Sequence, residues 1–175
     1  LSDITKFKEK SNILEYQASH DKLTGLFNRN KFDEVYSKEL KRSKRYNNEL
    51  SMIIFDIDDF KMVNDNYGHQ IGDDVLKEIA KIILKNVREQ DVNVRWGGEE
   101  FLILLPQTNL AGAVTVASKI RIAIKEHLFT PEILKITASF GVSQLLSEDS
   151  ETTFISRSDT LLYEAKKTGK DKVIS

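Results

Sequence analysis

Cysteine is absent from this chain of 175 residues, and proline occurs only twice. The lack of cysteine excludes disulfide bonds, thiol nucleophiles and cysteine metal sites, and it suits a reducing compartment. The longest apolar runs, such as residues 101–105, are far shorter than the about 20 residues that a membrane-spanning helix needs. Residues 1–19 are charged throughout, so we recognise no signal peptide. We therefore expect a cytoplasmic domain, and the sequence leaves open whether the intact protein is tethered to a membrane.

The chain also has almost no net charge, because 26 Lys and Arg residues oppose 27 Asp and Glu residues. A protein that grips nucleic acid backbones without sequence preference is normally basic, so nucleic acid is not an expected partner. The neutral total hides an acidic middle, since residues 51–110 carry 6 basic and 11 acidic side chains. Apolar residues make up 40% of the chain, which is typical of one globular domain with a buried core.

Apolar residues that recur at helical or alternating spacing predict an ordered series of helices and strands. We expect helices at residues 4–18, 31–46, 71–87, 111–128 and 159–167, and strands at residues 50–55, 92–96, 101–105, 134–142 and 173–174. Residues 97–100 would form a hairpin turn. Asp73 and Asp74 would lie in the first turn of their helix, where the helix dipole favours acids. This order predicts an α+β fold in which helices cover a central, mostly antiparallel sheet.

The first helix carries a short seam of residues spaced alternately by three and four positions: Ile4, Phe7, Ser11, Leu14 and Ala18. That spacing is typical of a coiled coil, but it lasts for only about two heptads. Two interpretations stay open. The helix either packs on its own domain as an ordinary amphipathic helix, or it transmits a signal from an upstream region.

Four carboxylates lie at the ends of two predicted strands. Asp56 and Asp58 follow the strand at 50–55, and Glu99 and Glu100 lie in the hairpin turn. If the strands are neighbours, these charges meet at one rim of the sheet, where they repel each other unless a cation neutralises them. Oxygen ligands without His or Cys favour Mg²⁺ or Mn²⁺ over zinc. Solvated turn acids remain the alternative for each cluster taken alone.

Residues that suit a nucleotide follow the acids. Lys61 offers a cation to a phosphate group, next to open backbone amides. Asn64 and Asp73 flank a turn, and an amide with a carboxylate can read the edge of guanine. Both residues are also ordinary helix caps, and that alternative stays open. The Gly97-Gly98 pair would let a backbone approach a ligand closely.

Other catalytic templates are missing from the sequence. Gly169-Lys170 is followed by Asp171 and lacks the upstream glycine of a Walker A phosphate loop. The chain has no G-x-S-x-G elbow, so a serine hydrolase has no support. The three histidines lie in different contexts, and we expect each of them to pack or cap rather than to bind a metal.

Taken together, the motifs resemble the GGDEF family of diguanylate cyclases in its GGEEF spelling. The resemblance covers about residues 19–174, and chance does not explain five stretches in the same order. These stretches are residues 20–29 (HDKLTGLFNR), 55–73 (FDIDDFKMVNDNYGHQIGD), 95–101 (RWGGEEF), 139–142 (SFGV) and 162–166 (LYEAK).

This resemblance implies a nucleotide-cyclase-like fold with a ferredoxin-like core. It also implies an enzyme, a diguanylate cyclase that condenses two GTP molecules into cyclic dimeric GMP and releases pyrophosphate. Each domain would hold one GTP, so catalysis would require a homodimer with facing half-sites. Residues 19–175 would form the catalytic domain, and residues 1–18 would form a signalling helix that links it to an upstream sensor domain of the PAS type.

The same resemblance assigns roles to individual residues. Asp56, the backbone carbonyl of Ile57 and Glu99 would hold two Mg²⁺ (or Mn²⁺) ions. Glu100 would be the general base for the 3′-hydroxyl, and Lys61 would act with it on the reacting phosphate. The other substrate contacts would come from Asn64 and Asp73 at the guanine with His69 nearby, and from Asp59, Phe60, Gly97, Gly98, Lys166 and Lys170.

Arg88 and Asp91 resemble the R-x-x-D inhibitory site of the family, where bound product would slow the enzyme. A plain surface ion pair is the alternative. Lys170 departs from the family pattern, which often has arginine there, so a point charge replaces a forked guanidinium. Asn30 also stands where a second arginine is common.

Two functions of different classes follow from the resemblance. The first is an active, product-inhibited cyclase, and the second is a catalytically silent receptor that binds GTP or cyclic dimeric GMP. Silent members of the family usually lose a turn glycine or a metal acid, whereas this chain keeps Gly97, Gly98, Glu99, Glu100 and Asp56. The motifs therefore favour the active enzyme.

Overall fold

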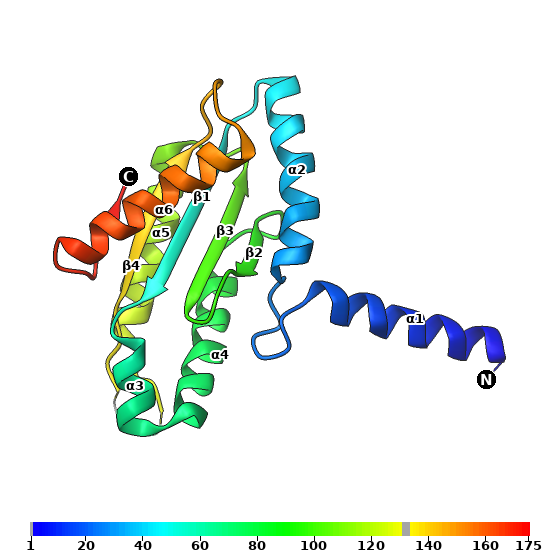
Figure 1. The fold of residues 1–175 in the computed structure, drawn as a ribbon, viewed down its shortest axis with the longest axis horizontal. Helices are drawn as coiled ribbons and strands as arrows, with labels where there is room; N and C mark the ends of the chain where they lie inside the picture. The colour runs from blue at the N-terminus through cyan, green and yellow to red at the C-terminus, as the bar shows by residue number, and fades with distance from the viewer. Residues whose placement is uncertain (1, 131–133) are drawn as a thin grey trace.

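The computed structural model describes residues 2–130 and 134–175 and contains one five-stranded sheet. Its strands are β1 (Leu50–Ile57), β2 (Val92–Arg95), β3 (Glu100–Pro106), β4 (Ala138–Gln144) and β5 (Val173–Ile174). They lie in the order β2-β3-β1-β4-β5 (Figure 1). Only the β4–β5 pair is parallel among these strands, and the other three pairs are antiparallel. This mostly antiparallel sheet confirms the predicted α+β fold.

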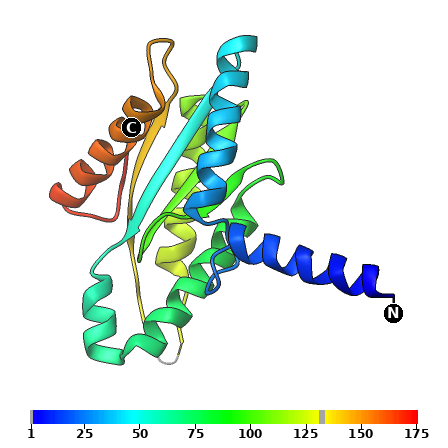
Figure 2. The ribbon, with the colours of Figure 1, turned by 45° about the vertical axis from the view of Figure 1, so that its right-hand side comes forward.

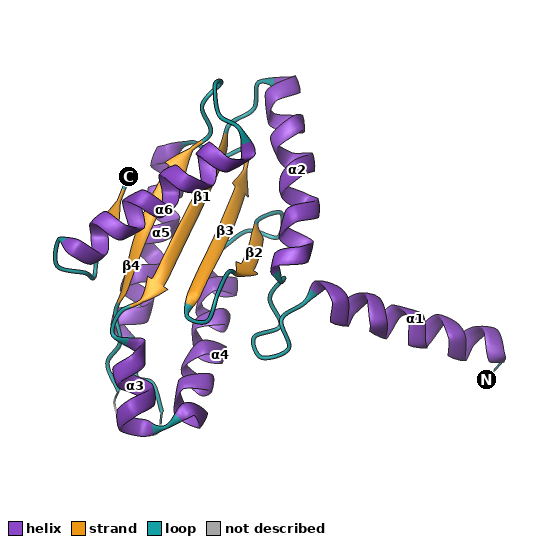
Figure 3. Ribbon diagram, in the orientation of Figure 1, coloured by secondary structure: helices purple, strands orange, loops and turns teal. Residues whose placement is uncertain are grey.

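Helices cover both faces of the sheet (Figure 3). The described helices are α1 (Asp3–Ser19), α2 (Arg29–Tyr46), α3 (Phe60–Tyr67), α4 (His69–Asn86), α5 (Leu110–Glu126) and α6 (Glu151–Lys167). Of these, α2 and α6 pack on one face of the sheet, and α4 and α5 pack on the other. Successive residues of a strand point to opposite faces, so Phe55 of β1 packs with α4 and α5, and Ile54 packs with α2 and α6. Within β1 every residue except Asp56 is buried. The one residue of the central strand that is partly exposed therefore lies near its C-terminal end.

The segment after β1 forms a helix that the sequence pattern did not predict. α3 is eight residues long and buries only Phe60 and Val63, too few apolar positions to produce a helical period. The next helix, α4, begins at His69 instead of residue 71. The expectation that acidic residues lie in its first turn is therefore wrong, because Asp73 falls one turn later.

The strand expected at residues 134–142 is shorter than predicted. β4 begins at Ala138, because Leu134 forms an isolated bridge with Phe129 outside the sheet. Leu1 belongs to the expected signalling helix (residues 1–18), and residues 131–133 belong to the expected catalytic domain (residues 19–175). These four residues lie outside the described residues.

The helix expected at residues 159–167 is longer than predicted. α6 begins eight residues earlier, at Glu151, because Ser150 caps it. The Ser150 hydroxyl accepts a hydrogen bond from the Thr153 backbone N–H, and the Thr153 hydroxyl accepts one from the Ser150 N–H. This capping box uses threonine where the usual signature has Glu or Gln, so the sequence pattern did not reveal it.

α1 projects away from the rest of the described chain (Figures 1 and 2). None of its residues is buried, and Ile4, Phe7 and Leu14 are 76%, 74% and 57% exposed. The predicted seam therefore faces solvent, and the interpretation that this helix packs on its own domain is wrong. Across residues 2–130 and 134–175, no helix is long and apolar enough to cross a bilayer.

Candidate active site

The predicted carboxylates meet at one end of the central strands. Antiparallel pairing places Asp56, near the end of β1, directly opposite Glu100, the first residue of β3. The backbone N–H of Ile57 donates to the carbonyl of Glu99 at 3.2 Å, which brings the third acid to the same rim. The expectation that the two strands are neighbours and gather their acids is confirmed.

A lysine from α6 lies among these acids. The Nζ of Lys166 is 2.6 Å from Oδ1 of Asp56 and 2.8 Å from Oδ1 of Asp58. It also donates to the backbone carbonyl of Ile57 at 3.2 Å. The Asp56 carboxylate and the Ile57 carbonyl thus already converge on one cationic group.

Two carboxylates at this rim, Asp56 and Glu100, have a pKa above the ordinary value of their residue type. Burial raises the pKa of Asp56, and the nearby charges of Glu99 and Asp58 raise it further, while Lys166 partly opposes them. Burial and the charge of Asp56 likewise raise the pKa of Glu100. The acids therefore exceed the positive charge available to them, and a further cation would stabilise their ionised forms.

The donor set fits a hard divalent cation. Asp56 and Glu99 offer carboxylate oxygens and Ile57 a carbonyl oxygen, which are the ligand types that Mg²⁺ and Mn²⁺ prefer. In the described part of the chain no three or more His, Cys, Asp or Glu side chains form a group that could hold a metal. The expected ligands are two carboxylates, of Asp56 and Glu99, and the Ile57 carbonyl, so this metal site does not require a cluster of three such side chains.

Asp58 joins neighbouring segments through hydrogen bonds, a structural role that the sequence did not suggest. Its side chain is buried and accepts hydrogen bonds from the hydroxyls of Thr137 at 2.8 Å and Ser139 at 2.7 Å. It also accepts one from the backbone N–H of Asp171 at 3.1 Å. Burial alone would raise the pKa of Asp58, but the hydrogen bonds from Lys166, Ser139 and Thr137 outweigh it and lower the pKa. Asp58 therefore stays ionised and ties β1, β4 and the end of α6 together.

The Gly97-Gly98 turn is held by a residue that the sequence analysis did not single out. Arg95 donates from Nε and Nη2 to the carbonyl of Gly98, at 3.2 and 2.8 Å. Its Nη1 lies 3.2 Å from Oδ2 of Asp21, in the loop after α1. A side chain added at Gly98 would meet nothing within 4 Å, so the outer side of the turn is open. Both Arg95 and Asp21 belong to the motifs quoted in the sequence analysis, and this membership was the one sequence signal that could have pointed to them.

The residues expected to read guanine lie on α3 and α4. Gly68 joins the two helices with a φ of 89°, a conformation that favours glycine. A Cβ on Gly72 would come within 1.9 Å of the Asn64 Oδ1, so only glycine lets the Asn64 side chain lie against α4. Asp73 is exposed on the next position of α4, as is His69 at its start. Neither Asn64 nor Asp73 is at a helix start, so the alternative that they are N-caps is wrong.

The expected phosphate contacts converge only in part. Lys170 reaches the turn between β1 and α3, where its Nζ lies 2.6 Å from Oδ1 of Asp59. Asp59 has a φ of 55° and precedes Phe60, the first residue of α3. Lys61 is exposed in the first turn of α3, and no hydrogen bond or ion pair among the described residues joins it to the acids. Lys166 thus already lies beside the carboxylates of the rim and Lys170 beside Asp59, whereas Lys61 faces solvent.

Arg88 and Asp91 lie at the opposite end of β3. The backbone N–H of Arg88 donates to Asp91 Oδ2 at 2.8 Å, and its Nη2 donates to Oδ1 at 3.1 Å. The same Nη2 contacts the carbonyl of Pro106 at 2.9 Å and the hydroxyl of Thr108 at 2.6 Å. A cavity of about 350 Å³ beside them is lined by Arg88, Thr108 and Gln107 among others. The pair is formed, as both the inhibitory site and the plain ion pair require.

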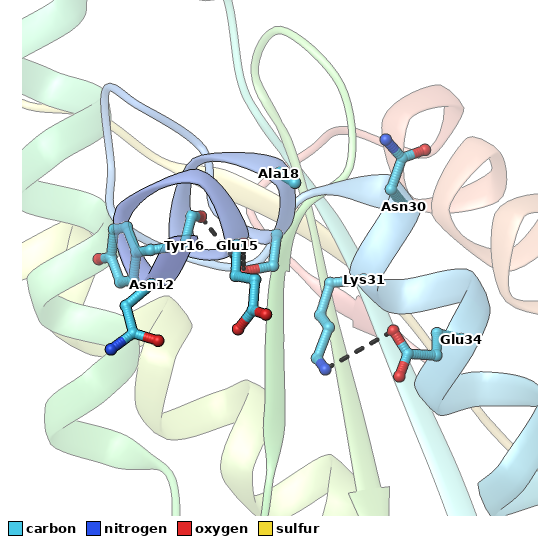
Figure 4. Close-up of a pocket in the computed structure, with 8 residues that line it drawn as sticks. Asn12, Glu15, Tyr16, Ala18, Asn30, Lys31 and Glu34 are labelled. Atoms are coloured by element: carbon cyan, nitrogen blue, oxygen red, sulfur yellow. Dashed lines mark hydrogen bonds and ion pairs between the residues drawn. The ribbon is translucent and has the colours of Figure 1, made fainter. Parts of the chain in front are cut away.

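A second groove, of about 560 Å³, lies between α1 and α2 (Figure 4). Polar side chains line much of it, including Asn12 and Glu15 from α1. On the α2 side Lys31 forms an ion pair with Glu34, with Nζ 3.7 Å from Oε2. None of the residues expected to bind metal or nucleotide lines this groove. The candidate active site is therefore at the acids and not here.

Comparison with known proteins identifies the family of the chain. The family model described as "Diguanylate cyclase, GGDEF domain" matches residues 18–172. The Escherichia coli K12 protein named diguanylate cyclase DgcM is 35% identical over 173 residues, which cover 99% of this chain and 42% of DgcM. The chain spans between 35% and 51% of the length of the curated relatives that it matches first.

Two solved structures are similar over most of the chain. One is the coiled coil and GGDEF domain of DgcB from Caulobacter crescentus in complex with c-di-GMP. It has a TM-score of 0.94 and 25% identity, covering 98% of this chain and 93% of that one. The other is the active GGEEF domain of a diguanylate cyclase from Vibrio cholerae, with a TM-score of 0.76 and 37% identity, covering 78% and 88%. Both share the nucleotide-cyclase-like fold described above.

Proposed function

Because the chain belongs to the GGDEF domain family, we propose that it is an active diguanylate cyclase, which condenses two GTP molecules into cyclic dimeric GMP and releases two pyrophosphates. The observation that carries this proposal is the meeting of Asp56, Glu99 and Glu100 at one rim of the sheet, beside the carbonyl of Ile57. The Vibrio cholerae domain described as active has the same GGEEF spelling. No acid or glycine of that motif is missing here.

Asp56, Glu99 and the carbonyl of Ile57 would hold Mg²⁺ or Mn²⁺, with two ions in each site. Bound there, the ions would neutralise charge on the triphosphate and make the 3′-hydroxyl more acidic. Lys166 now contacts Asp56 and Ile57 and is long enough to turn toward a phosphate when those oxygens bind a metal. Charge neutralisation at this rim would then be shared by the metal and the lysine.

Glu100 would accept the proton of the 3′-hydroxyl as that oxygen attacks the α-phosphorus of the other GTP. Its raised pKa, caused first by burial and then by the charge of Asp56, makes it a stronger proton acceptor than an ordinary glutamate. Lys61, with the backbone amides of Asp59 and Phe60, would bind the phosphates from the start of α3. Lys170 would approach them from the end of α6, where it now pairs with Asp59.

Asn64 and Asp73 would select guanine, with His69 nearby. The Asp73 carboxylate can accept hydrogen bonds from the guanine N1–H and N2–H₂, and the Asn64 amide can donate to its acceptors. Adenine offers no N1–H, so it would leave the Asp73 carboxylate without a donor.

A homodimer would complete the reaction, since each domain holds one of the two nucleotides. The exposed α1 seam supports this, because apolar residues such as Phe7 and Leu14 lack a partner within the described chain. The similar DgcB structure includes a coiled coil. Residues 1–18 would pair with a second copy and relay a signal from an upstream sensor domain of the PAS type. Arg88 and Asp91 would bind the product and inhibit the enzyme.

Incubation of the chain with GTP and Mg²⁺ at high concentration tests the proposal, with cyclic dimeric GMP measured as product. We expect the rate per protomer to rise with protein concentration, because a weak dimer forms by mass action. An Asp56→Ala variant should be inactive. Tight GTP or cyclic dimeric GMP binding without turnover would instead identify a silent receptor, and full turnover by the Asp56 variant would refute the metal assignment.

A further inference from the structure

The loop between α6 and β5 has an unusual backbone. Gly169, Lys170 and Asp171 follow one another with φ values of 114°, 61° and 46°. Glycine adopts such angles freely, but lysine and aspartate rarely do, and a run of three requires contacts that hold it in place. The Lys170 backbone N–H donates to the carbonyl of Ala165 at 3.0 Å, which closes the end of α6. Asp171 makes further contacts that hold the loop.

Asp171 is held between two cations of α5. Its Oδ1 lies 2.8 Å from Nη1 of Arg121, and its Oδ2 lies 2.6 Å from Nζ of Lys125. Its backbone N–H donates to the buried Asp58 at 3.1 Å. Burial alone would raise the pKa of Asp171, but Lys125 and Arg121 outweigh it and lower the pKa. We call Asp171, Arg121 and Lys125 the α5 tether.

The tether directs a lysine into the candidate active site. With the backbone of Asp171 fixed on Asp58, the preceding Lys170 points toward the β1–α3 turn and reaches Asp59 at 2.6 Å. A lysine contributes a point charge on a flexible stem, so its effect on a phosphate depends on where its backbone is held. An arginine, common in the family at this position, would bring its own fork geometry. With lysine at position 170, the direction of the charge therefore depends more on the tether than it would with arginine.

From this geometry we propose that Asp171 is a positioning residue for the triphosphate of GTP. It acts through Lys170, and with Arg121 and Lys125 it makes α5 part of the phosphate site. The inference rests on the proposed function, because Lys170 is a phosphate contact only if the chain binds GTP. It goes beyond that function because the proposed function assigns no role to Asp171, Arg121 or Lys125.

Ordinary surface ion pairs contribute little, and two features separate the tether from them. One carboxylate serves two cations, whose side chains are 25% and 55% exposed, while Asp171 itself is only 23% exposed. The same residue also has a left-handed backbone bound to a buried acid. Loss of the Asp171 carboxylate would therefore free the turn at residues 169–171 from α5, which is a larger change than the loss of one surface ion pair.

The first test compares the affinity for two ligands in four variants. The ligands are guanosine and a GTP analogue with a methylene bridge between the α- and β-phosphorus atoms, which cannot react. The variants are Asp171→Ala, Lys170→Ala, their double variant, and Glu34→Ala as a matched control, in which a more exposed carboxylate on α2 loses its ion pairs with Lys31 and Lys38. Asp171→Ala should weaken binding of the analogue by up to about tenfold and leave guanosine unchanged, because only the phosphates are affected.

The double variant decides whether Asp171 acts through Lys170. It should bind the analogue as weakly as Lys170→Ala alone. Once the Lys170 ammonium group is gone, Asp171 has no charge left to position, so its loss should have no further effect. Asp171→Asn keeps one acceptor and tolerates the left-handed backbone, so its affinity should lie between those of the wild type and Asp171→Ala. Additive losses, an equal loss for guanosine, or no loss at all would overturn the positioning role.

Hydrogen exchange of the amides of residues 169–172 provides a readout without nucleotide. Exchange should be faster in Asp171→Ala than in Glu34→Ala, because without the ion pairs to Arg121 and Lys125 the backbone N–H of residue 171 is held less firmly against Asp58. Unchanged exchange would refute the tether whatever the binding data show. Failure of the wild type to bind the GTP analogue would refute the proposed function, while the exchange data would still decide whether the turn is held.

Discussion

The carboxylates at the two ends of β3 have opposite surroundings, since one end is rich in acids and the other pairs an acid with an arginine. At its start, Glu100 faces Asp56 across the strand pair, and burial together with the charges of neighbouring carboxylates raises the pKa of both. At its far end, the buried Asp91 accepts hydrogen bonds from the backbone and guanidinium of Arg88. The first end has more acid than cation, and the second end is balanced. An excess of negative charge marks the end where a metal and a charged substrate are expected, whereas at the other end one guanidinium already neutralises the carboxylate.

The largest effect should come from the acid-rich end. Asp56→Ala removes a proposed metal ligand, and we expect turnover of GTP to fall by about a thousandfold or more, since metal contacts contribute several kcal/mol to such transition states. The rate of cyclic dimeric GMP formation measures it, with Glu34→Ala as a control of similar size. Residual turnover within tenfold of the wild type would show that this end of β3 does not hold the metal.

Glu100→Gln keeps the shape of the side chain and removes its basicity. We expect a loss of about a hundredfold in kcat, the range typical of a general base, with little change in KM. In the wild type the raised pKa of Glu100 should shift the acidic limb of the pH–rate profile above that of an ordinary glutamate. If Glu100→Gln keeps a normal kcat, metal ions alone activate the 3′-hydroxyl.

Arg88→Ala tests the balanced end of the strand. The inhibition constant for cyclic dimeric GMP should rise by about tenfold or more, because a guanidinium hydrogen bond to a ligand is lost. The measurement is inhibition of initial rates by added product. An unchanged inhibition constant would show that Arg88 and Asp91 form only the ion pair seen here.

The smallest expected effect concerns stability. The raised pKa of Glu100 means that the folded chain binds this proton more tightly than the unfolded chain does. That contribution to stability is complete at low pH and is lost as the pH rises through the raised pKa. Glu100→Gln should therefore raise the melting temperature at pH 7 by no more than about 4 °C.

The same linkage makes the stability effect depend on pH. At about pH 3.5, below the ordinary glutamate pKa, the two proteins should melt at nearly the same temperature. Thermal unfolding followed by circular dichroism at both pH values measures the difference. A lower melting temperature for Glu100→Gln at pH 7 would show that the ionised carboxylate is stabilised, so the acid-rich end would not have the excess charge inferred here.

The strands could be predicted more reliably than the helix boundaries. β1, β2 and β3 were found within two residues at each end, because their apolar runs are short and bounded by polar breaks. α3 was missed because only Phe60 and Val63 of its eight residues are buried. The start of α6 was missed because its capping box uses Thr153. Polar contacts, and not apolar periodicity, set those ends.

The motifs carry the resemblance to the GGDEF family, with its acids and glycines intact, since each motif is local and can be read residue by residue. Spacing cannot show which acids face each other, because Asp56 and Glu100 are far apart in the chain and meet only when β1 and β3 pair in register. The same holds for Arg95 with Asp21, for Asp171 with α5, and for the exposure of α1. Such contacts depend on how the helices and strands bury their apolar faces against one another, and that packing exists only in the folded chain.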